Sequence, residues 1–269
     1  MPYFAATCSE GLEDMLAFEL SLYGVRNIFK GRQEVIFDCD IDKISELMIK
    51  LRTADNIIIK NKSSPEDMLK GTRLNIRPLY LRDYRVFNHP SSLLPSVAAA
   101  LLLCTDMKRD LIDPFVGGGT VLIEDALMMH QSVNERLPYT TEIHRIMGID
   151  INPHHLSGAK KNAKRAGVAD IIRLELADST KIKLYPLFSR MVTNPPFGVK
   201  GSKKERILKL YDRFAANIDN ILSPNAEGII ITTEWNQIVK ILSDRGFRLK
   251  EVRKFRHRRL YTGAVHFFL

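Results

Sequence analysis

From about Leu93 to the end of the chain, short apolar runs alternate with longer segments whose apolar residues recur at helical spacing. Short apolar runs are typical of strands buried on both faces, and the amphipathic segments between them are typical of crossover helices. This alternation predicts a doubly wound, mostly parallel sheet. The expected strands are Leu111–Phe115, Ile146–Asp150, Ile171–Ala177, Met191–Asn194, Gly228–Thr233, Phe247–Lys254 and Ala264–Leu269.

Two segments between these strands stand out. Residues Arg206–Leu222 are expected to form one helix, because their apolar residues follow a single stripe. That stripe consists of Ile207, Leu210, Tyr211, Phe214, Ile218 and Ile221. Residues Gln131–His144 interrupt the alternation and are expected to form an irregular insertion.

Residues 1–60 follow a different pattern, which predicts a small βαββαβ unit with a ferredoxin-like order. Thr7 and Glu10 have the spacing of a capping box, so we expect them to open a helix that Gly24 ends. A hairpin is expected about Gly31, and Asp42 is expected to cap a second helix. Residues 61–80 are interpreted as a linker, and residues 81–269 as the second domain.

The charge of the chain is uneven. The 269 residues carry a net charge of +9. Residues 1–60 hold 7 Lys and Arg against 10 Asp and Glu, whereas residues 61–269 hold 33 against 21. A basic body of this kind indicates a polyanionic partner such as nucleic acid, although a basic protein without such a partner has the same composition.

The cysteines and the hydropathy indicate where the protein works. Cys8, Cys39 and Cys104 are scattered without the spacing of a metal site, so we expect free thiols, no metal and a cytoplasmic location. The longest apolar run, Val97–Cys104, is too short to span a bilayer. The N-terminus lacks the pattern of a signal peptide, so no membrane association is expected.

A glycine-rich loop follows the first strand of the second domain and opens a helix. Glycines allow the backbone to approach a ligand closely, and the helix start offers free N–H groups. We therefore interpret this loop as a ligand-binding loop, while a plain turn remains the alternative. Its candidate binding residues are Asp113, Pro114, Phe115, Gly117, Gly119 and Thr120.

Two further acids follow the next two strands. Asp150, followed by Ile151, can accept both hydroxyls of a ribose. Asp178, followed by Ser179, can accept from the N6 amine of an adenine. Either acid could instead cap a helix. Because ligands bind at the carboxyl ends of strands in such sheets, acidic residues at three successive strand ends favour a nucleotide-like cofactor.

The most specific motif follows the fourth strand as Asn194-Pro195-Pro196-Phe197. An exocyclic amine is a weak nucleophile because its lone pair is delocalised. The Asn194 side-chain carbonyl and the Pro195 backbone carbonyl could each accept one amine hydrogen and direct the lone pair toward a methyl donor. The prolines stiffen the loop, and Phe197 can stack on a planar substrate. A buried turn with a core phenylalanine is the alternative.

Together these motifs resemble the class I, Rossmann-like methyltransferases that use S-adenosylmethionine. More narrowly, the chain is similar to the THUMP-associated RNA guanine-N2 methyltransferases. Four stretches carry this likeness: FAATCSEGLEDMLAFEL, YRVFNHPSSLLPSVAAAL, DPFVGGGTVLIEDAL and TNPPFG. The resemblance implies a ferredoxin-like domain followed by a seven-stranded catalytic domain, with S-adenosylmethionine as cofactor and RNA, foremost tRNA or else rRNA, as substrate.

The resemblance also implies roles for individual residues. The glycine loop, Asp150, Ile151, Asp178, Ser179 and Asn194 match the cofactor site, and the loop from Asn194 to Phe197 matches the catalytic loop. His89, Pro90, Leu94 and Pro95 match a segment beside the methionine end of the cofactor. We leave His89 out of catalysis, since a lone histidine is more often structural.

The chain departs from the family in two ways. Between Lys60 and Arg73 there is no room for the RNA-binding THUMP domain, which suggests a protein partner that captures the RNA. The glycine loop reads GGGT where relatives often read GSGT.

Two basic runs are expected to contact RNA phosphates. One follows the catalytic loop, with Lys200, Lys203, Lys204, Arg206 and Lys209, and the other spans Lys250–Arg259. A third set on Lys160–Arg165 is interpreted as a solvated helix face. Two other functions remain open: methylation of a different NH2 group, such as adenine N6, cytosine N4 or a protein glutamine, and a non-catalytic RNA-binding subunit.

Overall fold

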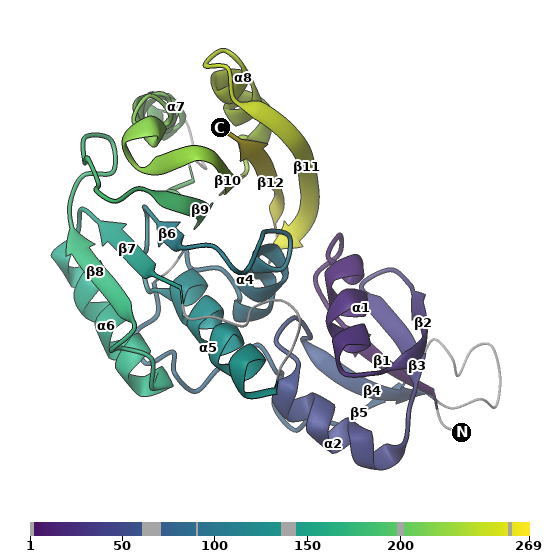
Figure 1. Cartoon of the computed structure of the whole chain (residues 1–269). Coiled ribbons are helices and arrows are strands. Elements are labelled where there is room, and N and C mark those ends of the chain that lie inside the picture. Colours follow the sequence, from purple (N-terminus) through teal and green to yellow (C-terminus); the bar gives the residue numbers. More distant parts are fainter. Residues whose placement is uncertain (1–2, 61–70, 90, 136–143, 198–201, 258–259) are drawn as a thin grey trace. The chain divides into compact units, whose positions relative to one another are not determined.

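The computed structural model describes residues 3–60, 71–89, 91–135, 144–197, 202–257 and 260–269 (Figure 1). These residues form two compact units. The first contains Met1–Arg82 and Leu94–Ala100, and the second contains Asp83–Leu93 and Leu101–Leu269. The functional motifs of the sequence fall in the second unit.

The first unit is ferredoxin-like, as the sequence predicts. Its antiparallel sheet has the strand order β2-β3-β1-β4-β5. The expected hairpin about Gly31 joins β2 and β3, and Gly24 follows α1 in a left-handed conformation with a φ of 73°. The elements are β1 (Tyr3–Thr7), α1 (Glu13–Leu22), β2 (Arg26–Lys30), β3 (Glu34–Asp38), α2 (Ile41–Lys50), β4 (Asn56–Lys60) and β5 (Gly71–Arg73).

Three local predictions in this region need correction. The capping box is wrong, because Thr7 ends β1, where it pairs with Glu34 and Asn56, and α1 begins only at Glu13. The N-cap of α2 is Asp40, two residues before the expected Asp42. Residues 71–73, within the expected linker, form strand β5 against β4.

The second unit contains the expected seven-stranded sheet, in the order β11-β12-β10-β9-β6-β7-β8. The strands from β10 to β8 are parallel, whereas β12 runs antiparallel to both of its neighbours. All seven predicted strands are present, with shifted ends. They are β6 (Leu111–Asp113), β7 (Ile146–Asp150), β8 (Ile172–Leu176), β9 (Phe188–Thr193), β10 (Leu222–Thr232), β11 (Arg248–His257) and β12 (Leu260–Phe268).

Helices cover this sheet, with α5 packed against α6 and α7 packed against α8 (Figure 1). A buried core joins the sheet to α7 and α8, and it includes Ile112, Ile149, Met191, Phe214 and Ile238. The helices outside the first unit are α5 (Thr120–Glu135), α6 (Pro153–Ala166), α7 (Ser202–Ala215) and α8 (Trp235–Ser243), while α4 (Pro95–Leu102) is divided between the units.

Two helix predictions differ from the structure. The expected helix Arg206–Leu222 ends at Ala215, because the Asn217 side chain donates to the carbonyls of Ser179 and Ile182 and turns the chain into a short 3-10 helix, η1 (Ile218–Asn220). Ile218 and Ile221 remain buried, so the apolar stripe continues across the break. The first five residues of the expected insertion, 131–135, belong to α5, and residues 136–143 lie outside the described residues.

Candidate active site

The glycine loop connects β6 to α5 in a conformation that requires glycine. Gly117 and Gly119 have φ values of 51° and 80°, which L side chains rarely adopt. A Cβ at Gly119 would lie 3.2 Å from the Cβ of Ala159 on α6. The loop therefore brings backbone N–H groups close to the carboxyl edge of the sheet, where a ligand can reach them.

A cavity of about 450 Å³ opens at this edge, a size typical of a small-molecule site. Most of the predicted cofactor residues line it: Asp113, Phe115, Gly117, Thr120, Asp150, Ile151, Asp178, Ser179 and Asn194. Pro196 of the catalytic loop also lines it. Pro114, Gly119, Pro195 and Phe197 are not among its lining residues. The structure thus brings together side chains that the sequence separates by up to about 80 positions.

Asp113 is the most buried acid in the cavity wall, with 2% of its surface exposed. Its Oδ1 accepts hydrogen bonds from the Thr193 hydroxyl at 2.6 Å and the Phe115 N–H at 3.1 Å. Burial raises the pKa of Asp113 from 3.8 to about 7, although these two hydrogen bonds oppose the shift. Without a ligand, the carboxyl group is therefore partly protonated near neutral pH.

This shift predicts a pH dependence of stability. A raised pKa in the folded state contributes stability that is complete below about pH 4 and is lost as the pH rises through about 7. Asp113→Asn should remove this contribution. The melting temperature of the wild type should fall relative to that of Asp113→Asn between pH 4 and 7, and parallel melting curves across this range would contradict the assignment.

Asp150 ends β7 and is fixed by three donors. Its Oδ2 accepts from the Gly117 N–H at 3.0 Å, and its Oδ1 accepts from the Asn152 N–H at 2.9 Å and lies 3.2 Å from His155 Nδ1. The N-cap of α6 is Asn152 and not Asp150, so the helix-cap alternative does not describe Asp150. The carboxylate is held against the glycine loop, with lone pairs left for further donors.

Asp178 follows β8 and is shaped by its own turn. Its Oδ1 accepts from both the N–H and the hydroxyl of Thr180, at 2.9 and 2.7 Å. Burial raises the pKa of Asp178, but these hydrogen bonds and Lys181 outweigh it, so the pKa stays below its usual range. The hydroxyl of the neighbouring Ser179 donates to the Pro114 carbonyl and ties this turn to the glycine loop.

Asn194 carries the chemical potential of the site. Its Nδ2 donates to the Ser91 carbonyl at 2.9 Å, which fixes the orientation of the amide. Its Oδ1 is buried and has no hydrogen-bond partner in the structure, which is costly for a carbonyl oxygen. A fixed, unsatisfied acceptor in a cavity wall is suited to receive a hydrogen from a bound ligand.

The rest of the catalytic loop is held from behind. The Tyr211 hydroxyl, on α7, donates to the Pro196 carbonyl at 2.9 Å and lies 2.9 Å from the Thr232 hydroxyl at the end of β10. Tyr211 and Pro195 are buried, whereas Phe197 is half-buried. The loop is therefore anchored to two elements of the core.

Sequence reasoning missed three residues that position the cavity wall. Asn162 on α6 is buried, and its amide bonds the N–H and carbonyl of Phe87 and the carbonyl of Gly118. The Phe87 ring fills the space above Gly158, where a Cβ would lie 2.2 Å from it. A glycine inside a helical pattern often marks such a packing contact, so Gly158 was the available signal.

Two histidines also lie in the cavity wall. The rings of His89 and His155 meet edge to face with centroids 4.4 Å apart, and the Ser91 N–H donates to His89 Nδ1 at 3.3 Å. Burial and the neighbouring His155 lower the pKa of His89. His89 therefore supports the backbone of Ser91, which in turn holds Asn194.

The expected substrate residues are placed less completely. Arg206 and Lys209 are exposed on α7. Lys200 and Pro90 lie outside the described residues, as do the side chains of Lys203 and Lys204. Lys160, Lys161, Lys164 and Arg165 are exposed on α6.

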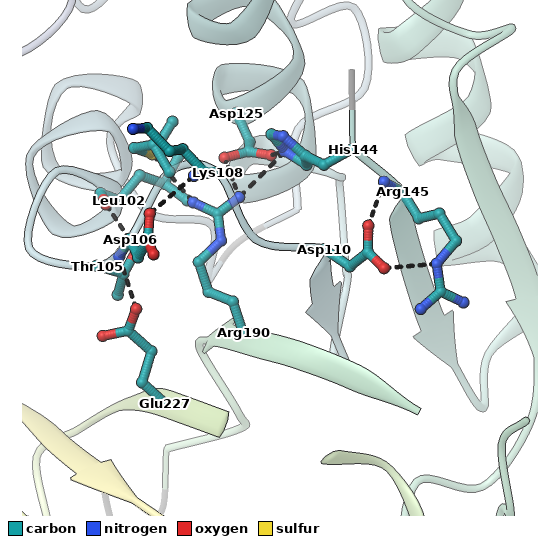
Figure 2. A network of polar contacts seen from close by, with 11 residues as sticks. Leu102, Thr105, Asp106, Lys108, Asp110, Asp125, His144, Arg145, Arg190 and Glu227 are labelled. Atoms are coloured by element: carbon teal, nitrogen blue, oxygen red, sulfur yellow. Dashed lines mark hydrogen bonds and ion pairs between the residues drawn. The ribbon is translucent and has the colours of Figure 1, made fainter. Parts of the chain in front are cut away.

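A buried ionic cluster supports the strand that leads to Asn194. Figure 2 shows Arg190 of β9 reaching Asp125 of α5 and His144. The Arg190 guanidinium lies 2.7 Å from Asp125 Oδ1 and 3.2 Å from His144 Nε2, which is itself 2.6 Å from Asp125 Oδ2. Arg190 and Asp125 are fully buried, so each charge depends on the other.

Two searches of the structure bear on other functions. Within the described ranges, no helix has the length and apolar character needed to cross a membrane. Likewise, no three His, Cys, Asp or Glu side chains of the described residues gather as they would around a metal ion.

Comparisons with protein families match both units. Residues 82–263 match the family described as the RMKL-like methyltransferase domain, and residues 3–58 match the RlmL ferredoxin-like domain.

Individual proteins agree with these matches. The chain is 32% identical over 200 residues to the tRNA (guanine(6)-N2)-methyltransferase of Methanocaldococcus jannaschii, covering 63% of this chain and 52% of that protein. It is 31% identical over 207 residues to the enzyme of the same name from Archaeoglobus fulgidus, covering 71% and 52%. The chain therefore spans about half the length of these curated relatives.

Solved structures show the same fold. A possible methylase from Clostridium difficile 630 superposes with a TM-score of 0.82 over 99% of this chain and 97% of that chain, at 19% identity. Both units of the chain thus occur together in a known structure.

Proposed function

Because this chain belongs to the RMKL-like methyltransferase family, we propose that it transfers a methyl group from S-adenosylmethionine to the exocyclic N2 amine of a guanosine in RNA. We take tRNA as the first candidate substrate and rRNA as the second. The names of the archaeal relatives support guanine N2 and tRNA. The observation that carries the proposal is the buried, unsatisfied Oδ1 of Asn194 in the wall of the cavity.

The residues around the cavity fit S-adenosylmethionine. The glycine loop leaves room for a ligand beside Gly117, and Asp150 offers carboxylate oxygens to a ribose. Asp178 keeps Oδ2 for an adenine amine, since only the exposed Lys181 lies near it, at 3.7 Å. When bound, this cofactor would supply an electrophilic methyl group.

The chain's own residues would activate the amine. Asn194 Oδ1 would accept one amine hydrogen, and the Pro195 carbonyl a second, so that the nitrogen lone pair is freed from the ring. Tyr211 and the Ser91 carbonyl would keep this loop in place without rearrangement. No strong base is needed, because the amine loses its proton after it has gained the methyl group.

The cofactor assignment predicts that Asp150→Ala weakens binding of S-adenosylmethionine by about 1–3 kcal/mol, because the ribose hydroxyls lose their acceptor. Calorimetry on the wild type and the variant measures this directly. Asp170→Asn provides a control, since Asp170 lies after α6 and outside the cavity wall. A wild type without affinity for the cofactor would refute both the cofactor and the enzyme.

Exposed cations beside the catalytic loop are proposed to hold RNA phosphates. Lys203→Ala, Lys204→Ala and Arg206→Ala combined should weaken RNA binding and lower its salt dependence by about 0.7 per lost contact with single-stranded RNA. Cofactor affinity should not change. RNA binding equal to that of the wild type at every salt concentration would place the phosphates elsewhere.

The setting of the activity is also a proposal. Cys8, Cys39 and Cys104 are free, and burial raises the pKa of the Cys39 thiol to about 11, which suits unreactive thiols in the reducing cytoplasm. A protein partner that captures RNA is proposed to assist the chain.

A further inference from the structure

The hairpin of β11 and β12 extends past the end of the neighbouring strand. The register of β10 on β12 ends with Thr232 opposite Gly263, and Lys254 of β11 lies opposite the same glycine. Beyond this point β11 and β12 continue to pair with each other up to His257 and Leu260. We call residues 254–257 and 260–262 the basic ribbon.

The basic ribbon extends from the edge of the sheet that carries the candidate active site. In the parallel pair of β9 and β10, Thr193 lies opposite Ile230, so Asn194 and Thr232 are at the same edge. The Tyr211 hydroxyl contacts both Thr232 and the Pro196 carbonyl. The ribbon therefore continues the sheet on the side where a substrate must approach.

One face of the basic ribbon is cationic and aromatic. Residues directly opposite each other across two strands share a face, so Arg256 and its partner Tyr261 lie beside Lys254. All three are exposed, Tyr261 by 54%. The alternating residues Phe255 and His257 are buried. The exposed face thus consists of two cations and one aromatic ring.

A tryptophan extends this face. The Lys254 ammonium lies 5.7 Å from the ring centroid of Trp235, the first residue of α8, which packs against Gly263. Arg248 and Lys250, also exposed on β11, lie near the Phe268 ring. Strand β11 carries five Lys and Arg against a single acid, Glu251, and β12 carries no charged residue.

We propose that this face of the basic ribbon binds a single-stranded stretch of the RNA substrate next to the active site. Lys254 and Arg256 contact phosphates, and Tyr261 stacks on a base. This inference rests on the proposed function, because it assigns a second contact surface for the same RNA. It adds a surface separate from the cations that follow the catalytic loop.

Protection of a sheet edge is the competing explanation, since β11 is an edge strand and charges on edge strands prevent aggregation. That role requires charge of either sign and gains nothing from an exposed tyrosine. Charge reversal separates the two, because it keeps the edge charged and repels phosphates.

The test compares Lys254→Glu/Arg256→Glu with a matched control, Lys160→Glu/Lys161→Glu, on the exposed face of α6. The probe is a single-stranded oligoribonucleotide of about 12 nucleotides, within the range of known binding sites. Trp235 is the single tryptophan of the chain, so its fluorescence reports RNA at the ribbon. Filter binding at several salt concentrations gives the affinity, and calorimetry gives the affinity for S-adenosylmethionine.

The ribbon variant should bind the probe at least about 10-fold more weakly than the control variant and should lower the salt slope by about 1.4, the share of two phosphate contacts. Tyr261→Ala should weaken binding about 5-fold or more and reduce the change in Trp235 fluorescence. Cofactor affinity should stay at the wild-type value in every variant.

Equal RNA affinity in the ribbon and control variants, or a wild type that does not bind the probe, would overturn the inference. If the wild type binds S-adenosylmethionine and methylates RNA while the ribbon variant binds RNA normally, the ribbon inference fails and the proposed function stands. Ribbon-dependent RNA binding by a chain that neither binds the cofactor nor transfers methyl groups would refute the proposed function alone.

Discussion

Replacement of Asn194 by alanine is expected to slow methyl transfer about 10²–10³-fold, the scale measured when one preorganised polar contact is removed from a transition state. The Oδ1 atom is buried, unsatisfied and held by the contact of Nδ2 with Ser91. It gains its partner when the amine nitrogen begins to carry positive charge. Binding of RNA and cofactor depends on it much less, so turnover should fall far more than affinity.

Single-turnover methyl transfer, with both binding constants measured separately, checks this result. Asn194→Asp keeps an acceptor oxygen and adds a charge that can stabilise the developing cation, so it should retain more activity than the alanine variant. Phe197→Ala should instead raise the Michaelis constant for RNA, since stacking contributes about 1–3 kcal/mol per base. An alanine variant of Asn194 that transfers methyl groups at the wild-type rate would exclude this loop as the catalytic centre.

Replacement of Asp125 by alanine is expected to lower the free energy of unfolding by about 3–5 kcal/mol, because it leaves the Arg190 guanidinium buried without its counterion. Arg190 and Asp125 are both fully buried, and His144 contacts both (Figure 2). In a chain of this size each kcal/mol lowers the melting temperature by about 2–4 °C. The variant should therefore melt roughly 10 °C below the wild type.

Asp110 provides the matched control, since it pairs with Arg145 at 2.6 Å but both side chains are partly exposed (Figure 2). Exposed ion pairs contribute about 0–1 kcal/mol, so Asp110→Ala should have a small effect. Adding Arg190→Met to Asp125→Ala should recover much of the lost stability, because it removes the unpaired charge. An Asp125→Ala variant as stable as Asp110→Ala would show that the buried cluster does not support the strand.

The larger features of the fold were predictable because they rest on repeating local patterns. Each strand of the second unit appears in the sequence as an apolar run, and the loops at Gly117, Asp150 and Asn194 follow three of them. In a parallel sheet all such loops meet at one edge, so adjacency in space follows from position along the strands. The shared cavity confirms that adjacency.

The errors arose where a tertiary contact overrode a local signal. Thr7 and Glu10 have the spacing of a capping box, but the backbone of Thr7 is engaged by two strands of the sheet. The stripe from Ile207 to Ile221 predicts one helix, but the Asn217 side chain bonds two distant carbonyls and breaks it. Neither contact can be derived from the neighbouring sequence.

The supporting residues of the site were out of reach for the same reason. The contact of Asn162 with Phe87 and the burial of Arg190 each join positions far apart in the chain. An arginine in a short strand gives no sign that its charge will be enclosed. These residues hold the backbone of the cavity wall and the strand beneath Asn194, which local patterns do not reveal.

The identity of the methylated nucleoside tests the central claim most directly. The purified chain would be incubated with S-adenosylmethionine carrying a labelled methyl group and with unmodified tRNA, and the digested RNA analysed by mass spectrometry. We expect the label in N2-methylguanosine, with no label when Asn194→Ala replaces the wild type under the same conditions. Label in N6-methyladenosine or N4-methylcytosine, or in no nucleoside although the chain binds the cofactor, would contradict the assignment of this site to guanine N2.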